Sequence, residues 1–136
     1  MMLFRGLCLA YLICVIPSVA SAESDRAGGY AECGYLAHVA VEQMKKRGQT
    51  QEQITAVIRD VVGFSHLFYR ASGQVAPHRG PGINSEMLRE VARVGRAVHG
   101  RRVSGMSPVN SLKLSNRVLD DCRRDLSLFA GKDFAH

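Results

Sequence analysis

Apolar side chains recur every three or four residues in four segments of this chain, which is the spacing of amphipathic helices that bury one face. The first segment spans residues 30–47 and ends at Gly48, a residue that suits the C-terminus of a helix. Basic residues in its last turn complement the negative end of the helix dipole. Its predicted inner face consists of Tyr30, Cys33, Ala37, Ala40, Val41 and Met44.

The second segment opens with the sequence signature of a capping box. Thr50 and Gln53 are three residues apart, so each side chain can satisfy a free amide of the first helical turn. We expect this helix to end near Ala71, before Gly73. Its predicted buried stripe consists of Ile54, Val57, Ile58, Val61, Phe64, Ser65 and Phe68. Some apolar residues lie off the main stripes and are either ordinary exposed residues or a partner surface, namely Val39, Leu67 and Leu114.

The third segment follows a long loop that contains two prolines and reaches about Ile83. Asn84 or Ser85 is positioned to cap the helix, and Gly100 is predicted to end it. Residues 101–106 are then expected to be irregular. The predicted inner face consists of Leu88, Val91, Ala92, Gly95 and Val98.

The fourth segment has a strong start signal, with Ser107 as N-cap and Pro108 at the first helical position. Its predicted inner face consists of Leu112, Ser115, Leu119, Cys122, Leu126 and Phe129. No run of alternating apolar and polar residues is long enough for a convincing strand. The pattern therefore predicts an all-α fold, a small bundle of about four helices.

Residues 1–22 have the parts of a cleavable signal peptide, beginning with a basic residue near the start. Residues 7–16 form the apolar stretch, and small residues at 20–22 suit a cleavage site before Glu23. The alternative is a membrane anchor, but a spanning helix needs roughly 20 apolar residues, and this stretch is broken by Pro17. We expect cleavage, which leaves one helical domain over residues 23–136 in the periplasm or outside the cell.

Cleavage would remove Cys8 and Cys14 and leave Cys33 and Cys122, one near each end of the domain. Two cysteines in an exported domain most simply pair, and each of these falls on the predicted inner face of its helix. We therefore expect a disulfide between the first and last helices. Two free thiols or a metal pair are the alternatives, and His38 is poorly placed to share a metal with Cys33 because it points to another side of the helix.

The chain is basic, with a formal net charge of +6, and cleavage lowers this charge by one unit because Arg5 is lost. Arginines on the third helix recur at helical spacing and form a stripe, flanked by basic residues of the adjoining loops. The candidate site for an anion or an acidic partner consists of Arg89, Arg93, Arg96, Arg101, Arg102, His78 and Arg79. The simpler interpretation is that this stripe is an ordinary solvent-exposed helix face, since Glu86 and Glu90 can pair with its arginines.

Catalytic signatures are weak in this sequence. His38 and Glu42 are one helical turn apart, a spacing that allows acid–base chemistry but is also common on exposed helices. No metal-binding, nucleotide-binding or nucleophile-elbow motif is present, so we expect no metal and no cofactor.

We therefore expect a small exported non-catalytic binding protein, such as an inhibitor, an immunity-type protein or an envelope accessory factor. Its partner would be another protein or an anionic envelope component. Nucleic acid is a poor candidate because no binding motif accompanies the arginines. A small enzyme that uses His38 and Glu42, or a homo-oligomer with a structural role, is the alternative.

Overall fold

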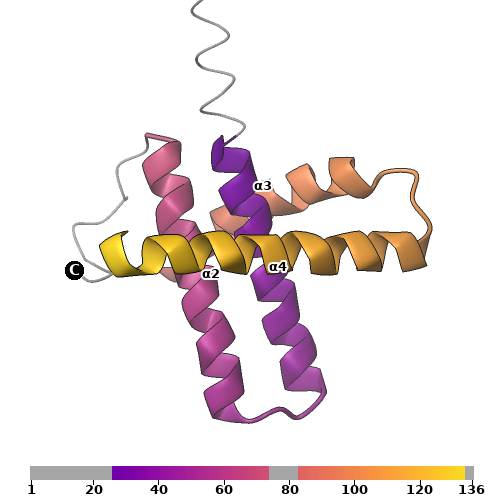
Figure 1. The fold of residues 1–136 in the computed structure, drawn as a ribbon, viewed down its shortest axis with the longest axis horizontal. Coiled ribbons are helices and arrows are strands. Elements are labelled where there is room, and N and C mark those ends of the chain that lie inside the picture. The colour runs from indigo at the N-terminus through magenta and orange to yellow at the C-terminus, as the bar shows by residue number, and fades with distance from the viewer. Residues whose placement is uncertain (1–25, 74–82, 134–136) are drawn as a thin grey trace, which may run out of the picture.

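A computed structural model of the chain describes residues 26–73 and 83–133, with side chains as far as Leu126. Every element in these residues is a helix, which confirms the predicted all-α class: residues 26–46, α2 (Gln51–Ala71), α3 (Ser85–Val103) and α4 (Pro108–Asp133). The helix of residues 26–46 and α2 run side by side, α4 crosses them, and α3 runs behind (Figure 1). The predicted signal peptide, residues 1–22, lies outside the described residues.

The connection between the first helix and α2 forms as the local sequence predicts. Gly48 has a positive φ of 68°, a conformation that costs glycine little. The Thr50 amide donates to Oε1 of Gln53 over 3.1 Å, and the Gln53 amide donates to Oγ1 of Thr50 over 3.3 Å. The capping box is therefore confirmed. Likewise α2 ends at Ala71, and Gly73 follows with a φ of 68°.

The core of α2 and α4 differs in part from the predicted stripes. Leu67, placed off the stripe by its spacing, is only 6% exposed, because α2 packs against both α3 and α4 and so buries a wider face. Leu112 was expected inside but is 58% exposed. Leu112 belongs to the first turns of α4, and these turns extend beyond the pair of helices that α4 crosses (Figure 1).

The expected end of α3 is wrong. The helix continues through Gly100 to Val103, and the chain reverses only at Ser104 and Gly105, where φ is 81°. A single glycine inside a helix costs about 1 kcal/mol relative to alanine, which the rest of a 19-residue helix can tolerate. The extra turn matters because it carries Arg102 back toward the first helix.

Small residues let α3 approach the first helix closely. A Cβ atom built on Gly95 would overlap the carbonyl of Ala31 and lie 2.7 Å from Cβ of Tyr35. A Cβ atom on Gly34 would lie 2.8 Å from Cγ1 of Val91. Both distances are closer than a side chain normally permits, so the crossing depends on glycine at these two positions.

The expected disulfide is confirmed between Cys33 in the first helix and Cys122 in α4. Their Cα atoms are 5.8 Å apart, although the residues are separated by 89 positions in sequence. In the chain-entropy model a loop of this length gives a stabilisation of at most about 4–5 kcal/mol. No helix within the described residues is long and apolar enough to cross a membrane.

Candidate functional site

A carboxylate is buried where the first helix meets the end of α3. Glu32 is only 1% exposed, and its oxygens accept three hydrogen bonds from Arg102. Nε of Arg102 lies 2.8 Å from Oε2 and 3.1 Å from Oε1, and Nη2 lies 2.9 Å from Oε1. This fork-like contact is the strongest geometry available to a guanidinium and a carboxylate.

His99 joins the same carboxylate to α4. Its Nδ1 lies 2.9 Å from Oε2 of Glu32, and its Nε2 lies 2.8 Å from Oγ of Ser115. Oγ of Ser115 also lies 2.8 Å from the carbonyl oxygen of Ser111, one turn earlier in α4. We call Glu32, Arg102, His99 and Ser115 the polar network, and it connects the first helix, α3 and α4.

The charge state of Glu32 fixes the direction of these hydrogen bonds. Burial alone would raise its pKa, but hydrogen bonds from Arg102 and His99 outweigh burial and leave the pKa below its ordinary value. Glu32 is therefore an ionised acceptor at neutral pH, and Nδ1 of His99 carries the proton that it donates. The hydroxyl of Ser115 donates to the carbonyl oxygen of Ser111, and it can donate to Nε2 of His99 instead when that nitrogen carries no proton.

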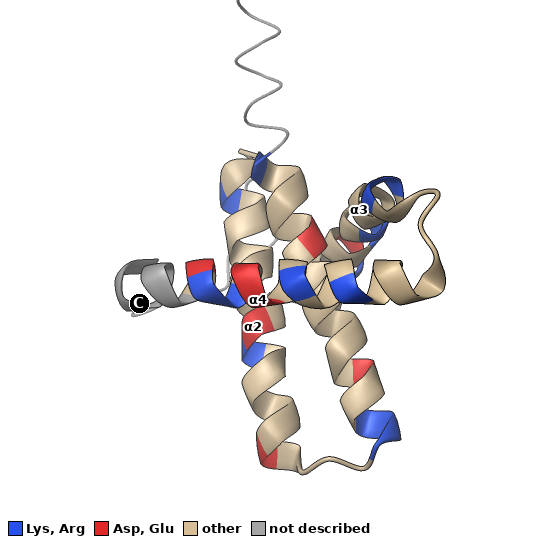
Figure 2. Ribbon diagram, turned by 45° about the vertical axis from the view of Figure 1, so that its right-hand side comes forward, with Lys and Arg blue, Asp and Glu red and all other residues tan. Residues whose placement is uncertain are grey.

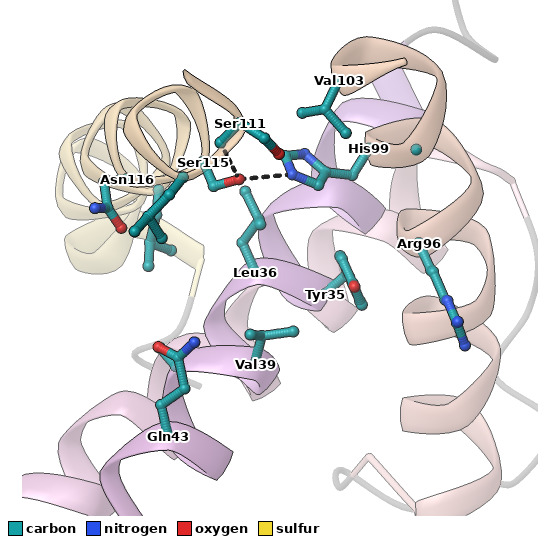
Figure 3. A pocket seen from close by; sticks show the side chains of 14 residues that line it. Tyr35, Leu36, Val39, Gln43, Arg96, His99, Val103, Ser111, Ser115 and Asn116 are labelled. Atoms are coloured by element: carbon teal, nitrogen blue, oxygen red, sulfur yellow. Dashed lines mark hydrogen bonds between the residues drawn. The ribbon is translucent and has the colours of Figure 1, made fainter. Parts of the chain in front are cut away.

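A pocket of about 430 Å³ lies beside the polar network. The first helix forms its floor, and α3 and α4 form its walls (Figure 3). Leu36, Val39 and Leu119 give it an apolar lining, while His99, Ser115 and Arg96 contribute polar atoms. Its size and mixed lining are those of sites that bind small molecules or single side chains of a partner.

Serine, imidazole and carboxylate in this order form the arrangement that activates a serine hydroxyl as a nucleophile. Two features separate this site from a serine hydrolase. Ser115 lies inside α4, where the backbone amides are used by the helix itself and offer no donors for an oxyanion. The carbonyl of Ser111 also competes with His99 for the hydroxyl hydrogen of Ser115.

The predicted basic site is divided by the structure. Arg89, Arg96 and Arg101 are exposed on α3, and no described carboxylate lies within ion-pair distance of them. Arg93 is also exposed and pairs with Glu90 at 2.7 Å. Arg102 instead belongs to the polar network. The remaining two predicted members, His78 and Arg79, lie outside the described residues.

Sequence reasoning missed two cations of α4 that extend the basic region. Lys113 and Arg117 are exposed on the first half of α4, before its first carboxylate at Asp120 (Figure 2). From residue 91 to residue 119 the chain has six Lys and Arg residues and no Asp or Glu. We call this segment the acid-free hairpin.

The pair expected from helical spacing, His38 and Glu42, is exposed on the first helix. Glu42 lies 3.5 Å from Nζ of Lys45, and the structure shows no hydrogen bond between Glu42 and His38. The buried histidine is His99, four residues after Gly95 on the inner stripe of α3. The helical spacing of His99 from Gly95 is the sequence feature that could have identified His99 as buried.

No group of three His, Cys, Asp or Glu side chains suited to a metal ion occurs in the described part of the chain. Comparison with protein-family models, with curated proteins and with solved structures finds no match for this chain.

Proposed function

We propose that the chain is an exported, non-catalytic binding protein that holds an acidic partner protein against the exposed face of α3. The observation that carries this proposal is the set of exposed arginines without an ion-pair partner among the described residues: Arg89, Arg96 and Arg101. A positive surface of this kind raises the rate of encounter with an acidic surface and disfavours basic ones.

The acid-free hairpin supports the same proposal. An acidic surface that approaches α3 meets no carboxylate from residue 91 to residue 119, so like-charge repulsion is low along this segment. The pocket beside Arg96 adds an apolar recess in which a partner side chain can be buried.

Rigidity of the framework is the second support. The Cys33–Cys122 disulfide and the polar network both fix the first helix against the elements that carry the cations. A surface held in one conformation loses less conformational entropy when it binds, which favours recognition of a partner.

The test is a charge reversal on α3 with a control of equal charge change. Arg89, Arg93 and Arg96 are changed together to Glu, and in a second protein Lys45, Lys46 and Arg47, exposed at the end of the first helix, are changed to Glu. Each immobilised protein is used to capture proteins from a native envelope extract, which are identified by mass spectrometry. We expect an acidic protein that is retained by the wild type and the control and lost from the α3 variant.

Equal capture by both variants would contradict the proposal, because it would show that the α3 surface is not used. Loss of capture in both would contradict it as well, since net charge alone would then explain binding. Light scattering of the purified protein tests the homo-oligomer alternative, and a stable dimer held together through α3 would replace the proposal.

A further inference from the structure

The hydroxyl of Ser115 is placed for a reaction that partner binding does not require. Ser115 is half-buried and lines the same pocket as His99 (Figure 3). Its Oγ lies 2.8 Å from Nε2 of His99, within the range required of a nucleophile and its base.

The base is held in one orientation by a group on another helix. Oε2 of Glu32 lies 2.9 Å from Nδ1 of His99, and in the neutral imidazole a proton on Nδ1 leaves the lone pair on Nε2. Arg102 in turn holds the carboxylate through three hydrogen bonds. A serine, a base and a group that orients the base are thus aligned at a pocket, with each link shorter than 3.0 Å.

We propose that Ser115 is an activated nucleophile that captures an acyl group from an activated ester, with His99 as the general base and Glu32 as a positioning residue. Oγ of Ser115 bonds to the carbonyl carbon of the ester while its proton passes to Nε2 of His99. The bond from that carbon to the leaving oxygen then breaks, and the proton on His99 passes to the departing alcohol. The products are an acyl-serine and a free alcohol, with no oxidation or reduction.

The same geometry sets the limit of this reaction. Loss of one oxyanion donor costs a serine enzyme about 10²–10³ in rate, and the amides around Ser115 are used within α4. Unactivated esters and amides are therefore outside its range, and hydrolysis of the acyl-serine is slow for the same reason. One acyl group per chain accumulates, which is capture rather than turnover and is independent of the partner-binding proposal.

The test uses p-nitrophenyl acetate with the oxidised, full-length domain. The wild type is expected to release a burst of p-nitrophenol that approaches one equivalent, with a mass increase of one acetyl group located on Ser115 by peptide mapping. Ser115→Ala is expected to abolish the burst. Ser111→Ala is the matched control, because this second serine lines the same pocket one turn earlier but has no hydrogen bond to His99.

Replacement of the base provides an independent readout. His99→Gln is expected to slow acylation about 100-fold, the scale of a lost general base, whereas His38→Gln on the exposed face of the first helix leaves the rate unchanged. Circular dichroism checks that each variant is folded. The proposal is overturned if the burst persists in Ser115→Ala, if acetyl groups are found on Ser111 or Lys113 in its place, or if the folded wild type shows no burst.

Discussion

The two faces of α3 lie in different surroundings. The outward face exposes Arg89, Arg93 and Arg96 to water, where their charges are screened. The inward face turns Gly95 and His99 toward the first helix, and both residues are buried. A basic side chain on the outward face is a candidate for binding a partner, whereas one on the inward face contributes to the stability of the fold.

Arg102 shows how the surroundings decide between these roles. Arg102 has the same charge as the exposed arginines of α3 and lies close to them in sequence. It nevertheless forms three hydrogen bonds to a buried carboxylate. Its own side chain is 48% exposed, so the cost of burial falls on Glu32 rather than on the guanidinium. Substitutions on the inward face should therefore affect folding, and those on the outward face should affect binding.

The largest effect is expected from Gly95→Ala on the inward face. The added methyl group would overlap the carbonyl of Ala31, so α3 would have to move away from the first helix. We expect a loss of at least about 3 kcal/mol in the free energy of unfolding, the upper end for overpacking. Urea denaturation followed by circular dichroism measures it.

The control is Gly100→Ala in the same helix, where nothing lies within 4 Å of the added atom. This change should stabilise the protein by about 0.5–1 kcal/mol, because alanine is the better helix former. Equal effects at the two glycines would show that α3 does not approach the first helix as described.

The next largest effect is expected from Arg102→Met, which leaves Glu32 buried with His99 as its remaining partner. Removal of one member of a buried ion pair costs about 3 kcal/mol or more. The neighbouring Arg101→Met is the control, since Arg101 is exposed and should change stability by less than about 0.5 kcal/mol. If the two variants have the same denaturation midpoint, the polar network does not stabilise the fold.

The smallest effect is expected from Arg93→Ala on the outward face. This side chain pairs with Glu90 at 2.7 Å, but both partners are solvent-exposed, so the pair is screened by water and salt. We expect no measurable change in the denaturation midpoint at physiological salt. A clear loss of stability would mean that the exposed pair contributes to folding and that the contrast between the faces is overstated.

Local signals explain why much of the fold was predictable from sequence. The capping box at Thr50, the proline start of α4 and the glycine that ends the first helix act within a few residues. Cys33 and Cys122 were paired because export and their inner faces both favoured it, and the structure confirms the bond.

The polar network could not be predicted in the same way. Glu32 and His99 are 67 residues apart, and nothing in the local pattern of either helix reveals that they meet. Arg102 was assigned to the surface because Gly100 was expected to end α3, which removed the turn that brings Arg102 to Glu32. The low helix propensity of Gly100 predicted the wrong C-terminal end for α3, because tertiary contacts stabilise the last turn of this helix.

The ionisation of Glu32 also links the inward face to acid stability. Its pKa is lowered on folding, so the unfolded chain binds a proton more readily than the native one does. The stabilisation from the ionised carboxylate is complete above its ordinary value of 4.5 and is lost as the pH falls through the lower native value. Asp60 has the opposite sign, because burial raises its pKa and Arg123, 3.5 Å away, offsets this only in part.

The most direct test of the polar network is therefore an NMR titration of the side-chain carboxyl carbons of Glu32 and Asp60 in the folded, oxidised protein. The account predicts a midpoint for Glu32 below 4.5 and one for Asp60 above 3.8. A Glu32 midpoint at or above 4.5 would contradict it, because a buried carboxylate without Arg102 and His99 as donors titrates at a raised pH.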